Sequence, residues 1–140
     1  MRCLIIGAGS IGSRRTRLLA EMGHEVLVAD VDMARSLAVA EAVPGIVAPF
    51  PGGHTNPAFW WDAVFVCTPA ATHVEVAHEA IAAGTKGLFV EKPLSTSMDG
   101  IPELIAECEA SGVITMGACN MRWAYPPWSE RWYSRADILR

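Results

Sequence analysis

Short apolar runs alternate with amphipathic segments along nearly all of the 140-residue chain. The apolar runs lack the polar alternation of half-exposed strands, so we expect each to be buried on both faces. The expected strands cover 2–6, 24–30, 45–48, 63–67, 87–91 and 113–117. The expected helices cover 11–22, 33–42 with Asp32 as its cap, 72–84, and 99–111 with Asp99 as its cap. Trp60 and Trp61 are expected to cover an apolar face. Buried strands separated by helices predict an α/β fold, a doubly wound parallel sheet of about six strands with the Rossmann architecture.

The composition indicates one folded domain and excludes several classes of protein. Hydrophobic residues make up 51% of the chain and charged residues 19%, which excludes a disordered chain. The formal charge of −4 gives no attraction to nucleic acid or to an anionic membrane, and no apolar run reaches the length of a bilayer span. Four cysteines lie far apart and form no CxxC pair, so we expect no metal site and a reducing, cytoplasmic location.

A glycine-rich loop, GAGSIG, connects the first expected strand to the first helix. Gly7, Gly9 and Gly12 fit the G-x-G-x-x-G spacing, and Ser10 and Ile11 lie between them. In a dinucleotide site the first glycine permits a tight turn, the second lets a pyrophosphate approach the backbone, and the third lets helix and strand pack closely. The phosphates then lie at the N-terminus of the helix. The alternative is a tight turn that holds no ligand.

The second expected strand ends in an acidic residue, Asp30, 18 positions after the last loop glycine. This spacing is typical of the carboxylate that binds the adenosine ribose, and its charge would repel a 2′-phosphate. We therefore expect NAD to be preferred over NADP, with Arg35 as the nearest cation. Alternatively, Asp30 is a turn residue. For at least two of the helix arginines at 14, 15 and 17, we expect a solvated helix face.

The stretch GLFVEKPLS places a glutamate, a lysine and a proline where the fifth strand leaves the sheet. A charge that enters a protein interior is costly unless it is paired, and proline cannot extend a central strand. Ligands of an open parallel sheet bind at the carboxyl ends of its strands. The motif therefore marks either a ligand-facing strand end or an ion pair on a solvated edge.

Three motifs together resemble the N-terminal domain of the glucose–fructose oxidoreductase, inositol dehydrogenase and MocA family. They are a TPxxxH loop, an EKP motif and GACNMRW at 117–123, which is similar to the family's GxNxRF segment. The resemblance covers residues 3–126. The residues that match the first two motifs are Thr68, Pro69, His73, Glu91, Lys92 and Pro93.

The resemblance implies an NAD site in which these six residues lie beside the cofactor. It implies that Lys92 is catalytic, binding the substrate and taking part in proton transfer, and that Glu91 orients it or contacts a ribose. It also implies a cis bond before Pro93 and a sugar, cyclitol or nucleotide-sugar substrate. His73 is either near the cofactor or a residue that starts a helix.

The chain differs from the family pattern in its length. We expect the dinucleotide-binding domain at 1–123 and a tail at 124–140, with a helix as one form, where family members continue into a second α/β substrate domain. Three explanations remain open: a free-standing domain, a truncated product, or a subunit completed by another chain. Turnover by the chain alone is expected to be very low. For the tail we favour a homodimer interface over packing on its own domain.

Two functions therefore compete. The first is the NAD-binding component of an oxidoreductase, in which Lys92 lies at the hydride-transfer site. The second is a non-catalytic, regulatory NAD(H)-binding module. The EKP lysine favours the first, because a sensor has no need of a lysine beside the nicotinamide.

Overall fold

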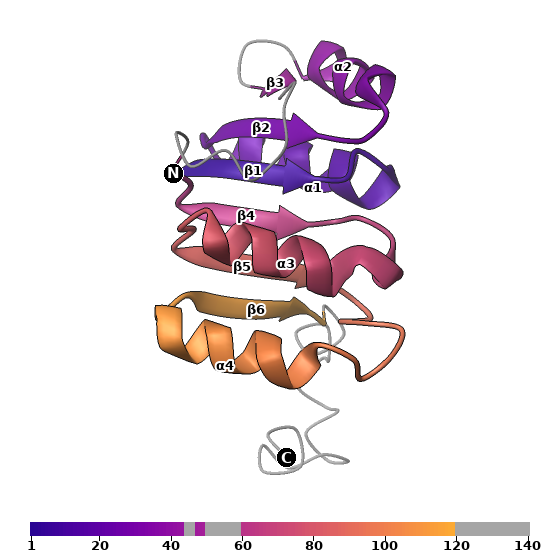
Figure 1. Ribbon diagram of the computed structural model, residues 1–140. Helices are drawn as coiled ribbons and strands as arrows, with labels where there is room; N and C mark the ends of the chain where they lie inside the picture. The colour runs from indigo at the N-terminus through magenta and orange to yellow at the C-terminus, as the bar shows by residue number, and fades with distance from the viewer. Residues whose placement is uncertain (44–46, 50–59, 120–140) are drawn as a thin grey trace, which may run out of the picture.

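The fold is a six-stranded parallel sheet with helices on both faces (Figure 1). The computed structural model describes residues 1–43, 47–49 and 60–119, and for 47–49 the backbone alone. The strands are β1 (Arg2–Ile6), β2 (Glu25–Ala29), β3 (Val47–Pro49), β4 (Ala63–Val66), β5 (Gly87–Glu91) and β6 (Ile114–Ala118). The predicted doubly wound fold is confirmed.

The strand order is β3-β2-β1-β4-β5-β6, and every neighbouring pair is parallel. Leu4 of β1 lies between Leu27 of β2 and Val64 of β4. The chain therefore builds outward from β1 in one direction and then, from β4, in the other. The carboxyl ends of β1 and β4 flank the point of reversal, where doubly wound folds bind their ligands.

The helices divide between the two faces of the sheet. They are α1 (Ser10–Glu21), α2 (Met33–Ala42), α3 (His73–Ala82) and α4 (Ile101–Ser111), and a 3-10 turn (Ala70–Thr72) precedes α3. Figure 1 shows α3 and α4 in front of the sheet and α1 behind it. Within the described helices, none is long and apolar enough to cross a membrane.

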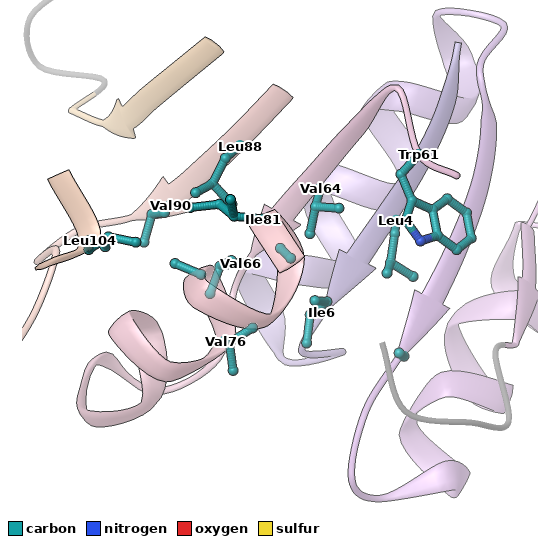
Figure 2. Packing of buried hydrophobic residues seen from close by; sticks show 13 residues of the cluster. Leu4, Ile6, Trp61, Val64, Val66, Val76, Ile81, Leu88, Val90 and Leu104 are labelled. Atoms are coloured by element: carbon teal, nitrogen blue, oxygen red, sulfur yellow. The ribbon is translucent and has the colours of Figure 1, made fainter. Parts of the chain in front are cut away.

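Successive residues of β1 supply the two hydrophobic cores. Cys3 and Ile5 pack with α1 and α2, whereas Leu4 and Ile6 pack with α3 and Leu104 of α4. This division follows from the two-residue period of a strand. Figure 2 shows the second core, in which the ring of Trp61 lies against Leu4.

Two expectations about local structure need correction. Both tryptophans before β4 were expected to cover an apolar face, but Trp61 is 1% exposed and Trp60 is 58% exposed. Helix α4 was expected to begin at Asp99, yet its N-cap is Gly100 at φ 74°. The Asp99 carboxylate instead accepts a hydrogen bond from the Ser97 hydroxyl. The expected cap of α2 is confirmed, since Asp32 accepts from the Ala34 amide.

Strand β6 is one of the two edge strands of the described sheet, and four of its five residues are exposed. Ile114 is 78% exposed and Met116 is 51% exposed. The expected domain boundary at 123, the tail at 124–140 and most of the GACNMRW motif lie outside the described residues, as does the start of the expected 45–48 strand.

Candidate functional site

The glycine loop has the geometry that a dinucleotide site needs. Gly7 has φ 100°, and a Cβ there would meet the Cys67 carbonyl at 2.7 Å. A Cβ on Gly12 would meet the Gly7 carbonyl oxygen at 1.8 Å. Around Gly9, by contrast, a Cβ would meet no described atom within 4 Å. Two of the glycines are therefore required by the fold, and the third lies beside open space.

Helix α1 begins at that open space. Gly9 is its N-cap and supplies no side-chain hydrogen bond, and the first helical bond runs from the Ser13 amide to the Gly9 carbonyl. The amides of Ser10 and Ile11 therefore keep their hydrogen-bonding capacity for a ligand. Free amides and the helix dipole together favour an anion here, so the loop fits the pyrophosphate of a dinucleotide.

Asp30 is held in place by backbone amides. Its carboxylate oxygens accept hydrogen bonds from the Ala8 amide at 2.7 Å and the Asp32 amide at 2.9 Å. Each carboxylate oxygen has a second lone pair that can accept a ribose hydroxyl. The bond to Ala8 also fixes the distance between the acidic residue and the glycine loop.

A pocket of about 840 Å³ connects the glycine loop, the end of β2 and the start of α3. Seven of the predicted cofactor residues line it: Gly7, Gly9, Ser10, Ile11, Asp30, Thr68 and Pro69. Sequence reasoning missed several lining residues, among them Val31, Met33, Cys67, Thr72 and Val76. Each lies within four positions of a predicted site residue. The motifs therefore located the segments that form the pocket, but they did not indicate which other residues of those segments line it.

Cys67 directly follows β4 and lines this pocket. Burial raises the pKa of its thiol from 9.0 to about 12; the Glu91 carboxylate adds to the rise and Arg15 opposes it. The thiol therefore stays neutral near pH 7 and acts as a small apolar group.

His73 lies behind the pocket wall rather than on it. It is 1% exposed, and its Nε2 and Nδ1 lie 2.7 Å from the Thr68 carbonyl oxygen and 2.8 Å from that of Pro93. His73 is also the first residue of α3. The histidine thus connects the TPxxxH loop to the EKP motif.

The EKP motif lies at the carboxyl end of β5, outside the pocket lining. Glu91 is 8% exposed, and its Oε1 accepts hydrogen bonds from Arg15 Nη2 at 2.7 Å and Nε at 3.1 Å. The Arg15 guanidinium also lies 4.6 Å from the centroid of the Phe89 ring. Lys92 is exposed, and the Lys92–Pro93 bond is cis, as the resemblance implied.

Fold and loop together define a dinucleotide-binding Rossmann domain. Residues 1–118 match the sequence family described as "Oxidoreductase family, NAD-binding Rossmann fold", GFO_IDH_MocA. The chain belongs to this glucose–fructose oxidoreductase, inositol dehydrogenase and MocA family, and it is the NAD-binding domain of such an oxidoreductase.

Individual relatives agree with this assignment. The chain is 35% identical over 116 residues to inositol 2-dehydrogenase of Paracoccus denitrificans, a match that covers 77% of this chain and 33% of the relative. UDP-N-acetylglucosamine 3-dehydrogenase GnnA from Acidithiobacillus ferrooxidans superposes with a TM-score of 0.78 at 26% identity, covering 90% of this chain and 40% of that one.

A second solved structure is that of GenD2 from gentamicin A biosynthesis in complex with NAD. It superposes with a TM-score of 0.78 at 27% identity, covering 94% of this chain and 37% of that one. The chain spans about a third of the length of the curated relatives it matches.

Proposed function

We propose that this domain holds the NAD of an oxidoreductase that acts on a hydroxyl group of a sugar, cyclitol or nucleotide sugar. The observation that carries the proposal is that the glycine loop, Asp30 and Lys92 each follow the carboxyl end of a strand of one parallel sheet, and so lie on the same side of it. The relatives named for inositol and for UDP-N-acetylglucosamine support this substrate class.

Bound NAD would supply the acceptor for a hydride from the carbon that bears the hydroxyl, and that carbon would become a carbonyl carbon. We propose that Lys92 holds the hydroxyl oxygen and takes up its proton, which then passes to water. Lys92 suits this role because it is exposed at the carboxyl end of β5, two strands from the glycine loop.

The remaining predicted cofactor residues fall into two groups, those that line the pocket and those that do not. The pocket residues Thr68 and Pro69 are proposed to lie along the dinucleotide. For Glu91, Pro93 and His73 we propose an indirect role, since Glu91 pairs with Arg15 and the other two bond to each other.

The test has a binding arm and a turnover arm. NADH fluorescence measures binding to the protein, and NADH absorbance measures turnover with NAD and a panel of sugars, cyclitols and nucleotide sugars. Turnover by the parent should be very low, and we expect Lys92→Ala to retain binding and lose this turnover, whereas Lys86→Ala, a matched change at the only other lysine, should retain both. Parent turnover no higher than that of Lys92→Ala on every member of the panel would favour the second candidate, a non-catalytic NAD-binding module.

For partners, we propose a homodimer rather than a chain that supplies a substrate domain. The exposed side chains of Ile114 and Met116 on β6 support an association surface there. Light scattering should report a dimer that Ile114→Glu dissociates and that Ile105→Glu, a matched change on α4, leaves intact. A monomeric parent protein would exclude the homodimer.

We also propose a cytoplasmic location. The support is that the cysteines of the described part, Cys3, Cys67, Cys108 and Cys119, are all free thiols. Fractionation of cells that express the protein would test this.

A further inference from the structure

The residues on either side of Lys92 are both held by side chains from helices. Glu91, immediately before it, pairs with Arg15 of α1. Pro93, immediately after it, offers its carbonyl oxygen to His73 of α3. Helices α1 and α3 pack in the two separate cores, one on each face of the sheet. The exposed lysine thus lies between two anchored neighbours.

The Arg15 contact is a charge-assisted one. Two guanidinium nitrogens reach Oε1 of Glu91, and the side chains are 29% and 10% exposed. Hydrogen bonds between charged groups are roughly twice as strong as neutral ones. The stacking of the guanidinium on Phe89 fixes its plane, so Glu91 meets a partner whose direction is set. Arg15 also lies on the helix whose N-terminus faces the pocket.

The His73 contact connects two loops through one buried ring. Its nitrogens lie 2.7 Å from the Thr68 carbonyl oxygen and 2.8 Å from the Pro93 carbonyl oxygen. Each ring nitrogen thus lies within hydrogen-bonding distance of a backbone carbonyl oxygen, one from each loop. Thr68 lines the pocket, and Pro93 adjoins Lys92. The imidazole therefore joins the pocket wall to the lysine loop.

We propose that Arg15 and His73 are positioning residues for Lys92. They fix the backbone before and after the lysine, and they couple it to the two elements that contact the cofactor, α1 and the Thr68 loop. This inference rests on the proposed function, because it concerns the placement of Lys92 beside bound NAD. The competing explanation is that both contacts serve the stability of the fold alone.

The chain offers a direct probe, because it contains only two lysines, Lys86 and Lys92. Reductive methylation with ¹³C-formaldehyde gives each lysine its own NMR signal and keeps its charge, and Lys92→Arg assigns the signals. In the parent protein we expect saturating NAD to shift the Lys92 signal and leave that of Lys86 in place. Thermal melts recorded in parallel measure stability separately.

In Arg15→Gln and His73→Phe we expect the NAD-induced shift of Lys92 to fall to about half or less, whereas the NAD Kd stays within about threefold. Arg14→Gln on α1 and His78→Asn on α3 are the matched controls, and they should retain the parent response. Where turnover is measurable, kcat should fall by about 10- to 100-fold with KM within about threefold. A loss of stability alone would not produce this division.

If His73→Phe does not fold, a double-mutant cycle still tests the proposal. The cycle consists of Arg15→Gln, Glu91→Gln and the double variant. All three should lose the same share of the Lys92 response, because each breaks the same contact. Bound NAD with an undiminished Lys92 shift in Arg15→Gln would overturn this inference and leave the proposed function standing. A parent protein that binds no NAD would overturn the proposed function and this inference with it.

Discussion

The glycine loop and the Lys92 loop both follow the carboxyl ends of strands in the parallel sheet, yet they are held in different ways. No Cβ fits at Gly7, which packs against the backbone of Cys67, or at Gly12, which packs against the backbone of Gly7. The Lys92 loop is instead anchored through side chains, those of Arg15 and His73, and presents an exposed ammonium. One part of the site depends on the absence of side chains and the other on their presence.

This difference separates binding from chemistry. The cofactor loop takes its shape from backbone contacts within this domain, so substitutions there should change folding or NAD affinity. The Lys92 loop presents the group that we propose for the chemistry, and we do not expect NAD affinity to depend on it. Substitutions there should leave affinity almost unchanged. Each prediction below tests one side of this division.

The largest effect is expected at Gly12. In Gly12→Val the new Cβ would lie 1.8 Å from the Gly7 carbonyl oxygen, so the helix or the loop must move. We expect a loss of about 3 kcal/mol in the free energy of unfolding, together with loss of NADH binding. Urea denaturation followed by circular dichroism measures the first. A variant as stable as the parent would show that the loop is not closely packed.

Gly9→Val provides the contrast on the same loop. Gly9 has φ −68° and faces open space, so the fold should tolerate a side chain within about 1 kcal/mol. NADH binding should be abolished, because the side chain occupies the place of the pyrophosphate. Fluorescence titration beside a denaturation curve separates the two quantities. Retained affinity would exclude a phosphate site at Gly9.

Asp30 should set the choice of cofactor. The parent protein is expected to bind NADH more tightly than NADPH, since the carboxylate repels a 2′-phosphate. Asp30→Ala should weaken NADH binding by about tenfold, or about 1.4 kcal/mol, and reduce the difference between the cofactors. Asp32→Ala, two positions on, is the control. Equal affinities of the parent for both cofactors would remove this role of Asp30.

Cys67 lines the pocket beside the glycine loop and should make stability depend on alkaline pH. Its pKa is raised from 9.0 to about 12 in the folded protein, mainly by burial. Above pH 9 the unfolded chain releases this proton and the folded chain keeps it, so stability falls as pH rises towards 12. Relative to Cys67→Ala, the parent should lose about 1.4 kcal/mol per pH unit in this range. A constant difference between the two proteins would contradict the buried thiol.

The smallest effect on binding is expected at Lys92. Because the side chain is exposed, Lys92→Ala should change the free energy of unfolding by less than about 0.5 kcal/mol. The NADH Kd should stay within about twofold of the parent value, a difference of about 0.4 kcal/mol. A tenfold loss of affinity would show that the two parts of the site are not separable in this way.

The sequence was sufficient for those features that depend on local pattern. Parallel strands, glycine-terminated helices and the Asp32 cap each follow from a few neighbouring residues, and all three are present. The expected burial of every strand is wrong for β6, in which four of five residues are exposed. The Arg15–Glu91 pair could not be predicted, because 76 positions separate its members and either charge alone is typical of a solvated surface. For the same reason His73 remained undecided until the Pro93 carbonyl, 20 positions away, was placed beside it.

The central position of β1 has a consequence for how the chain reaches its fold. This strand precedes the other described strands in the chain, yet its second neighbour, β4, begins only at Ala63. The Arg2 amide donates its hydrogen bond to the Asp62 carboxylate, 60 positions later in the chain. Pairing at such separation closes a long loop, so we expect folding on a scale of about milliseconds or slower. Until Trp61 and Val64 emerge from the ribosome, Leu4 lacks partners that cover it in the finished core, and a nascent chain at that stage should be readily cleaved by proteases.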